Sequence, residues 1–385
     1  MGNLRDFVAD TLEINDAVVE PLEPDGLEVL APEPVRKAMG WPELARLGFG
    51  VERPEGAIPA GLEGDWLDRF GTLLGDRGRW TERQVAASAL PGNPERLLER
   101  ALDLPNAVWR FQGVNATWTR CLLLSFRYTA LSDDKREGLV WLGLNLGSGA
   151  ALGDMLHRLK SQVELEPDWA APEPAARIAA GPSWSAAALE ARVKPLLEHR
   201  IRIELEPFLH AMRRRLERDR NRVHAYHDDL RRDALKRLAV LSSGSGEKAQ
   251  ADRKRETLRV AAIEREYHAK LDDLRRNYAL GVTVEWVQAL DLYMQVHRFD
   301  VAIRRRKGER SIQLDWHPLV RLAEPPLCDW GLGLSRTRLV CDEKLHLTEP
   351  QGQASCASCG KTWCRACHPA SCPHCRRASS SETRH

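Results

Sequence analysis

The stretch CDEKLHLTEPQGQASCASCGKTWCRACHPASCPHC, residues 341–375, decides how the end of this chain folds. It holds seven of the nine cysteines in the 385-residue sequence. With one histidine, these cysteines form four pairs, C-x4-H followed by three C-x2-C, separated by nine, four and four residues. A C-x2-C turn supplies two sulfurs from one tight loop, and four such donors satisfy tetrahedral zinc. The sequence therefore predicts two zinc ions and eight ligands: Cys341, His346, Cys356, Cys359, Cys364, Cys367, Cys372 and Cys375.

The spacing alone leaves the grouping of these donors open. Neighbouring pairs can share an ion in sequence order, or alternate pairs can share one in a cross-brace. His368 and His374 are alternative donors that could each replace a cysteine. Cys328 is left over from the pairs, and we expect it to be a core thiol rather than the remnant of another knuckle.

Residues 356–367, CASCGKTWCRAC, resemble the in-between-RING domain of RING-between-RING ubiquitin ligases. A RING cross-brace has two or three residues between its second and third pairs, whereas this chain has four. We therefore favour the sequential grouping, with residues 341–359 holding one ion and residues 364–375 the other. His346 stands where that family has cysteine and Cys372 where it has histidine. No flanking RING is recognisable, so the resemblance does not imply ligase activity.

A zinc ion enclosed by four protein donors has no open position for a substrate, which predicts a structural role. Other catalytic patterns are weak. The glycines of residues 147–153 follow an expected strand, but the third is one place late for a dinucleotide-binding fingerprint. No nucleophile elbow, metalloprotease helix or paired-carboxylate motif is present in the sequence. We therefore favour a non-catalytic protein.

The middle of the chain has the most regular hydrophobic pattern. From Pro207 to residue 241, and again over residues 247–278, apolar residues recur mostly at intervals of three and four. The turn SSGSG, residues 242–246, separates two arms of about 34 residues, each about 50 Å long. Arms of equal length predict an antiparallel coiled-coil hairpin. The expected fold class is α+β and multidomain, with this hairpin at the centre and the zinc module at the end.

Strands are predicted on either side of that hairpin. Residues 107–113, 117–128 and 139–146 are rich in aromatic and aliphatic residues, and residues 301–306 and 311–315 predict a β-hairpin. The resulting organisation is an α+β unit (1–80), an antiparallel sheet with helices (81–170), a linker and hairpin (171–280), a β-hairpin region (281–325), the zinc module (326–377) and a disordered tail (378–385).

Charge and hydropathy set the expected surroundings. The net charge is only +2, but residues 207–280 carry 19 Lys/Arg against 12 Asp/Glu. Basic clusters at residues 213–215, 253–255 and 304–307 could contact nucleic acid, although a solvated helix face explains the excess more simply. No apolar run is long enough to span a membrane. Residues 1–6 lack the apolar core of a signal peptide, so we expect a cytoplasmic protein, where clustered cysteines bind metal rather than form disulfides.

The whole layout, from the acidic start to a helical hairpin and zinc tail, resembles uncharacterised bacterial proteins that accompany Swi2/Snf2-type (RapA-like) helicases. This resemblance implies a protein partner of that kind. Our first hypothesis is a non-catalytic zinc-binding adaptor, in a complex with a nucleic-acid motor or a defence system. The alternatives are a ubiquitin-like ligase component and a direct nucleic-acid-binding protein.

Overall fold

The computed structural model describes residues 2–61, 63–75, 79–85, 92–165, 170–180, 184–306, 308–353 and 355–376. The chain divides into two compact units, Met1–Trp80 and Thr81–His385. The predicted disordered tail, residues 378–385, lies outside the described residues, as do residues 181–183 of the predicted linker and residues 166–169 before it.

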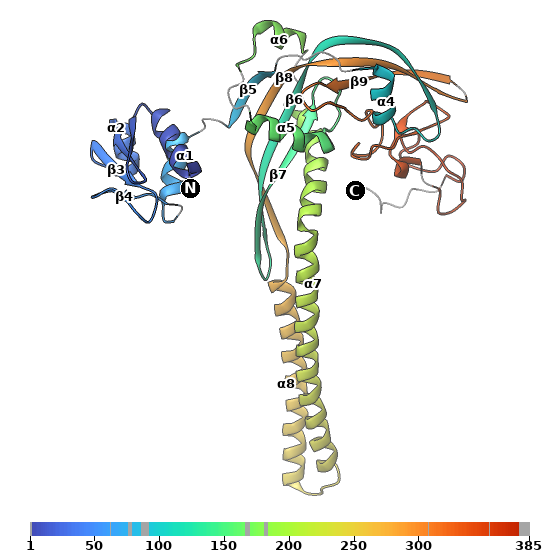
Figure 1. Ribbon diagram of the computed structural model, residues 1–385. Coiled ribbons are helices and arrows are strands. Elements are labelled where there is room, and N and C mark those ends of the chain that lie inside the picture. Colours follow the sequence, from blue (N-terminus) through green and yellow to red (C-terminus); the bar gives the residue numbers. More distant parts are fainter. Residues whose placement is uncertain are drawn as a thin grey trace. The chain divides into compact units, whose positions relative to one another are not determined.

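The first unit packs three helices on a small sheet (Figure 1). Its strands are β1 (Val18–Leu22), β2 (Gly26–Leu30), β3 (Leu44–Gly48) and β4 (Ile58–Pro59), with β4 parallel to β3 and the other pairs antiparallel. The helices are α1 (Gly2–Glu13), α2 (Glu33–Met39) and α3 (Trp66–Leu74). Pro34 lies at the start of α2 and Gly40 ends it in the left-handed conformation. Such a Pro start and Gly stop are typical of short helices.

The second unit is built on a large antiparallel sheet with the order β10-β9-β8-β6-β7, and β5 also pairs with β8. Two very long strands dominate it: β6 (Val108–Leu131) and β8 (Gly281–Arg305) pair along their whole length (Figure 1). The other strands are β5 (Trp80–Val85), β7 (Lys135–Asn145), β9 (Gly308–His317) and β10 (Leu322–Ala323). Two of the predicted strands merge into β6, with a register irregularity between Phe111 and Gly113.

A continuous buried apolar run in β6 gives this sheet two covered faces. Cys121 and Leu123 point to the face that packs on α5 (Gly153–Leu165). Leu122 and Leu124 point to the opposite face, which packs on the first turns of α7 (Ala186–Leu241). Adjacent residues of a strand point to opposite faces, so this alternation fixes which helix lies on which side. Two shorter helices, α4 (Pro94–Ala101) and α6 (Pro174–Ala179), complete the unit.

A buried polar network fixes the loop after β7. The Asn145 side-chain amide donates to Asp315 at 3.0 Å and to Glu324 at 2.8 Å, and its Oδ1 accepts from the backbone N–H of Gly147 at 2.9 Å. A side chain at Gly147 would place its Cβ 2.5 Å from Thr119 Oγ1. The predicted chain break at residues 147–149 is therefore a turn that needs glycine, and Asn145 holds it in place.

The predicted central coiled-coil hairpin is wrong. The centre of the second unit is the β6–β8 sheet, and the two long helices are unequal: α7 has 56 residues and α8 (Glu247–Asn277) has 31. After Leu205, the buried residues that the structure describes in α7 are His227 and Ala234, and those in α8 are Glu256 and Ile263. A coiled coil buries an apolar residue about every 3.5 positions, and this seam does not.

The helix boundaries explain the error. Pro207, expected to begin a helix, lies inside α7, as does Pro195. The helix begins much earlier, with Ser185 accepting a capping hydrogen bond from Ala188, because Leu196, Ile201 and Leu205 pack on the sheet. Beyond the sheet, α7 and α8 lie side by side, joined by the predicted turn at residues 242–246 (Figure 1). Polar contacts cross between them, including Tyr278 Oη to Asp219 at 2.7 Å.

The end of the described chain contains little regular structure. It has β11 (Leu339–Val340), β12 (Leu347–Thr348) and a 3₁₀ turn, η1 (Pro350–Gln353). Among the helices that the structure describes, none has the length and apolar character that crossing a bilayer requires.

Candidate metal centre

The first two predicted ligands lie at the ends of a short hairpin. The strands β11 and β12 pair through Val340 and Leu347, and the backbone N–H of Cys341 donates to His346 at 3.0 Å. Val340 and Leu347 are fully buried under the sheet, in the cluster that contains Phe299 and Trp316. The hairpin therefore anchors Cys341 and His346 to the large sheet.

Each of the three C-x2-C pairs forms a tight turn closed by a backbone hydrogen bond. Gly360 donates to the carbonyl of Cys356 at 2.8 Å, His368 to Cys364 at 3.1 Å, and Arg376 to Cys372 at 2.8 Å. Gly360 has φ +70°, in the left-handed region that favours glycine. Such a turn brings both sulfurs of a pair to the same side of the backbone, which is the geometry that a knuckle ligand pair needs.

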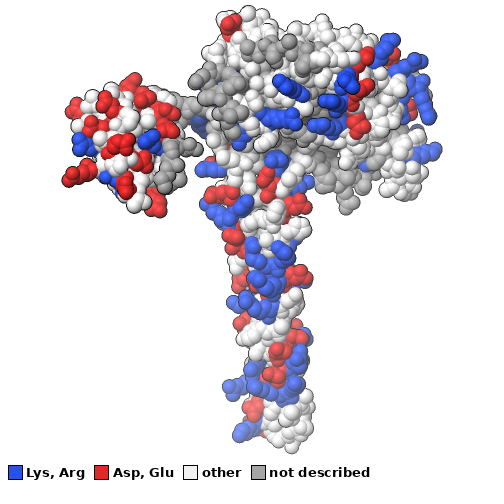
Figure 2. Space-filling view, viewed as in Figure 1, with Lys and Arg blue, Asp and Glu red and all other residues white. Residues whose placement is uncertain are grey.

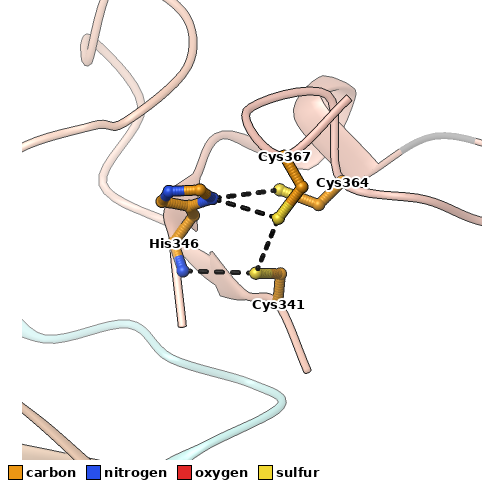
Figure 3. A group of neighbouring side chains, drawn as sticks. All are labelled: Cys341, His346, Cys364 and Cys367. Atoms are coloured by element: carbon orange, nitrogen blue, oxygen red, sulfur yellow. Dashed lines mark hydrogen bonds between the residues drawn. The ribbon is translucent and has the colours of Figure 1, made fainter. Parts of the chain in front are cut away.

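The structure brings the eight predicted donors together in two groups of four. In the first group, His346 Nδ1 lies 3.2 Å from Cys367 Sγ and 3.8 Å from Cys364 Sγ, and Cys341 Sγ lies 3.7 Å from Cys367 Sγ. Figure 3 shows the imidazole and the three sulfurs facing one another. All four donor atoms of this group lie within 4.8 Å of one another.

The second group contains four cysteines and no histidine. Cys356 Sγ lies 3.7 Å from Cys375 Sγ, and Cys359 Sγ lies 3.8 Å from Cys372 Sγ. The four sulfurs again lie within 4.8 Å of one another. Neither His368 nor His374 belongs to a group, so no predicted cysteine is replaced by histidine in this geometry. His368 instead contacts Glu343, with Nε2 2.8 Å from the carboxylate.

The sequential grouping predicted from the sequence is wrong. The first and third pairs meet, and the second and fourth pairs meet, which is the cross-brace arrangement. Two backbone contacts explain the difference. Arg365 donates to the carbonyl of Gly352 at 2.8 Å, which draws the third pair to the β11–β12 hairpin. The antiparallel bridge between Ser355 and Thr362 folds the second pair into a hairpin of its own.

Both groups fit zinc by distance and by donor type. A zinc–sulfur bond of about 2.3 Å in a tetrahedron separates neighbouring donors by about 3.8 Å. The separations above range from 3.2 to 3.8 Å, without any rearrangement of the chain. Thiolate and imidazole donors are those that zinc prefers. The two groups could therefore each hold one zinc ion.

Hydrogen bonds and burial give the thiols of the second group very different acidities. The backbone N–H groups of Cys359 and Ser358 lower the pKa of Cys356 to about 6. For Cys359, the N–H of Lys361 lowers the pKa, but burial and the neighbouring thiols outweigh it and raise the pKa to about 11. Four thiols so close together resist a shared negative charge. A divalent cation would remove that repulsion, which is a further reason why this group fits zinc.

The first group shows the same competition. Burial raises the pKa of the Cys341 thiol, but N–H groups of Lys344 and His346, at 3.4 and 3.2 Å from its sulfur, lower it overall. Burial raises the pKa of Cys367 well above its usual value, and the nearby Cys341 sulfur raises it further. In the metal-free protein, the thiol of Cys341 therefore ionises more readily than the thiol of Cys367.

Sequence reasoning missed the contacts that attach this region to the rest of the unit. The guanidinium of Arg365 lies between two indole rings, 5.5 Å from Trp330 and 5.4 Å from Trp363. Arg310 pairs with Asp329 at 2.6 Å, and Arg305 with Asp342 at 3.1 Å. A cation between two aromatic rings produces no periodic pattern in a sequence, so the sequence could not predict this contact.

The leftover cysteine and the basic clusters lie outside both groups. Cys328 is half-buried, and its thiol donates to the carbonyl of Trp330 at 2.6 Å. Within the predicted basic clusters, Arg215 pairs with Asp133 at 3.0 Å, Arg253 donates to the carbonyl of Gly244 at 2.7 Å, and Arg305 is occupied as described above. Figure 2 shows Lys and Arg interleaved with Asp and Glu along the two long helices. This pattern is typical of a solvated helix face.

Comparison with known proteins gives no match: no family model, no curated protein and no solved structure shows significant similarity to this chain. The resemblances to in-between-RING domains and to helicase-associated proteins therefore have no support from these comparisons. What the chain itself provides is a zinc-binding module with two four-donor groups, attached to a large antiparallel sheet.

Proposed function

We propose that this protein is a non-catalytic adaptor whose C-terminal module is held together by two structural zinc ions. The observation that carries the proposal is the closure of both donor groups: each has four Cys or His donors at tetrahedral spacing. Catalytic zinc sites keep one position for water or substrate, with three protein ligands. A complete set of four protein donors leaves no such position.

Zinc would supply the cross-links that the module otherwise lacks. Cys341, His346, Cys364 and Cys367 would hold one ion, and the four remaining cysteines the other. Among the described residues of the knuckles, the buried cluster is small and consists of Cys356, Trp363 and Cys372. Metal ligation can provide the folding free energy of such a module. The ions would thereby present a rigid surface beside the sheet.

A protein partner follows from this role as part of the proposal. The sequence layout makes a Swi2/Snf2-type helicase the first candidate, and a reducing compartment such as the cytoplasm suits the free thiols. The adaptor would hold that partner through surfaces of the second unit, where the large sheet and the zinc module give rigid support.

Affinity capture from the native host, followed by mass spectrometry, tests the adaptor. The full zinc-loaded chain is the bait, and the matched control is the double variant Cys364→Ser/Cys367→Ser, which removes one knuckle. We expect a stable protein partner with the intact chain and at least a tenfold lower recovery with the variant. Recovery of no partner above a tagged-only control, or equal recovery by both baits, contradicts the proposal.

A second candidate function is a component of a ubiquitin-like ligase. The observation that favours it is the alternate pairing of the four ligand pairs, because this is the arrangement of RING zinc modules. Incubation with an activated modifier and its carrier enzyme tests this candidate. Conjugates that disappear in the Cys364→Ser/Cys367→Ser variant would support it, and absence of conjugates with every modifier system of the host would exclude it.

A further inference from the structure

A groove runs along the outer edge of β7, between α5 and α7. Its volume is about 550 Å³, within the range of ligand-binding clefts. Trp141 and Leu139 of β7 line its floor, α5 contributes His157 and Lys160, and α7 contributes His199, Arg200 and Ile203. Because α5 and α7 cover opposite faces of the sheet, the groove opens onto the strand edge itself.

The strand at the bottom of this groove is the last of its sheet. In the sheet order, β7 has β6 on one side only. Its outer edge is occupied at one end, where Asn145 N–H donates to Ala150 at 2.9 Å and Leu152 N–H donates to Gly143 at 2.8 Å. Within the described residues, no strand continues this pairing beside Leu139 and Trp141.

The direction of the backbone groups follows from those two bonds. In an antiparallel strand, the N–H and C=O of one residue point to the same side, and this side alternates along the chain. Since the backbone N–H and C=O of Asn145 and Gly143 point to the outer edge, those of Trp141 and Leu139 point to the outer edge as well. The groove therefore exposes N–H donors and C=O acceptors at the positions where the next strand would bind.

The walls of the groove combine apolar surface with positive charge. Leu139 is 60% exposed and Ile203 47% exposed, so the groove presents open apolar surface. The Lys160 ammonium lies over the Trp141 ring, 4.8 Å from its centre. Among the described lining residues there is no carboxylate, and at the rim Arg200 pairs with Glu204 at 2.9 Å.

We propose that the edge of β7 accepts an extended segment of a partner protein, rich in acidic and apolar residues, as an additional strand. Strand addition uses backbone hydrogen bonds for affinity and side-chain pockets for specificity. Here alternate side chains of the segment face α5 and α7, and both walls carry cations. The inference rests on the adaptor function proposed above and names the chemistry of the partner.

Two other occupants fit the groove less well. A second copy of this chain would bring the same cations against themselves, because a two-fold contact pairs identical surfaces. Single-stranded nucleic acid needs open aromatic faces on which bases stack, whereas Lys160 already lies over the ring of Trp141. An acidic peptide brings no like charges together and does not require Lys160 to leave the ring of Trp141.

A random-peptide display library panned on the zinc-loaded full chain tests the proposal, because the probe does not presume a sequence. We expect the enriched peptides to carry several Asp or Glu alternating with apolar residues. Binding of the enriched peptides is then measured by fluorescence polarisation. Enrichment of basic or uncharged peptides, or no enrichment over unpanned library, overturns the proposal.

Three variants locate the binding site. Lys160→Glu/Arg200→Glu reverses the charge of both walls, and Leu139→Pro removes one outward N–H donor from an edge position where proline is tolerated. Both should weaken the enriched peptides at least tenfold. The control Lys248→Glu/Arg275→Glu makes the same charge change on exposed positions of α8 and should change binding less than twofold. Circular dichroism and zinc content establish that each variant is folded.

Unchanged binding by the charge-reversal variant overturns the groove as the site, whether or not the proline variant folds. The proposal is overturned in favour of nucleic acid if a dT20 oligonucleotide binds the intact chain but not this variant and no peptide binds the intact chain. Concentration-dependent self-association that the same variant abolishes overturns it in favour of a second copy. If host partners are still captured by the charge-reversal variant, the groove assignment fails and the adaptor function stands.

Discussion

The large sheet and the zinc module are neighbours in the second unit, but they are stabilised in different ways. The sheet pairs a strand of 24 residues with one of 25 and buries apolar side chains on both faces. The zinc module has strands of two residues whose Val340 and Leu347 belong to the core of the sheet, and the buried cluster described among the knuckles themselves has three side chains. Apolar burial can stabilise the sheet by itself, whereas under the proposed function the module would depend on zinc at its two ligand groups. The difference predicts that one unit combines a self-sufficient fold with a metal-dependent one.

Removal of zinc gives the largest expected effect. Structural zinc contributes on the order of 10 kcal/mol to the folding of small modules. A strong chelator should therefore unfold residues 355–376 while β6 and β8 stay folded. Hydrogen exchange followed by mass spectrometry measures both regions in one experiment. Equal loss of protection in the sheet, or retained protection in the module, would show that the comparison is mistaken.

A core substitution in the sheet should destabilise the sheet and leave the zinc module unchanged. Leu123 is buried in the part of the core that packs on α5, whose described members all lie outside the zinc module. Leu123→Ala should cost about 2–5 kcal/mol of unfolding free energy, because it leaves a cavity. The bound zinc, measured by atomic emission, should stay at two ions per chain. A variant that loses zinc in proportion to its lost stability would mean that the two regions fold as one.

Zinc affinity should fall as the pH is lowered. Zinc binds thiolates, so at neutral pH it must displace the proton of Cys359, whose pKa is raised to about 11. Each displaced proton weakens binding about tenfold per pH unit. Below pH 6 the dependence should steepen, because Cys356, with a pKa of about 6, begins to take up a proton as well. Competition with a coloured chelator between pH 5 and 8 measures this slope, and a flat profile would contradict the thiolate ligand set.

The smallest effect is expected at His368, which lies beside the module without belonging to either donor group. Its contact with Glu343 is partly exposed, with side-chain exposures of 35% and 53%. Such contacts contribute about 0.5 kcal/mol or less. His368→Ala should therefore keep both zinc ions in native mass spectrometry and shift chelator resistance very little. Loss of one ion would make His368 a ligand in place of a cysteine.

Local patterns in the sequence predicted the donors, many of the strands and the turn at residues 242–246. These features depend on residues close together in the chain: two cysteines in a turn, alternating apolar residues in a strand, or glycine and serine between helices. The continuity of β6 through Gly113 was harder to predict, because a glycine inside a strand pattern resembles a break. The strand continues there because β8 pairs with it on both sides of the irregularity.

The grouping of the ligand pairs and the central fold depend on contacts distant in sequence. The hydrogen bond from Arg365 to Gly352 and the burial of the β11–β12 hairpin under Phe299 decide which knuckles meet. Helical spacing in residues 207–278 was equally compatible with a coiled coil and with two solvated helices. Only the burial of polar groups such as His227 and Glu256 in the contact between the helices shows that the apolar seam is missing.

X-ray absorption spectroscopy of the zinc-loaded Cys364→Ser/Cys367→Ser variant tests the central claim most directly. Alternate pairing predicts that this variant keeps one zinc ion with four sulfur ligands, from Cys356, Cys359, Cys372 and Cys375. Sequential pairing would instead leave one zinc ion with three sulfur ligands and one imidazole nitrogen, because His346 would stay with Cys341, Cys356 and Cys359. A four-sulfur shell supports the cross-braced module, and a shell with one nitrogen contradicts it.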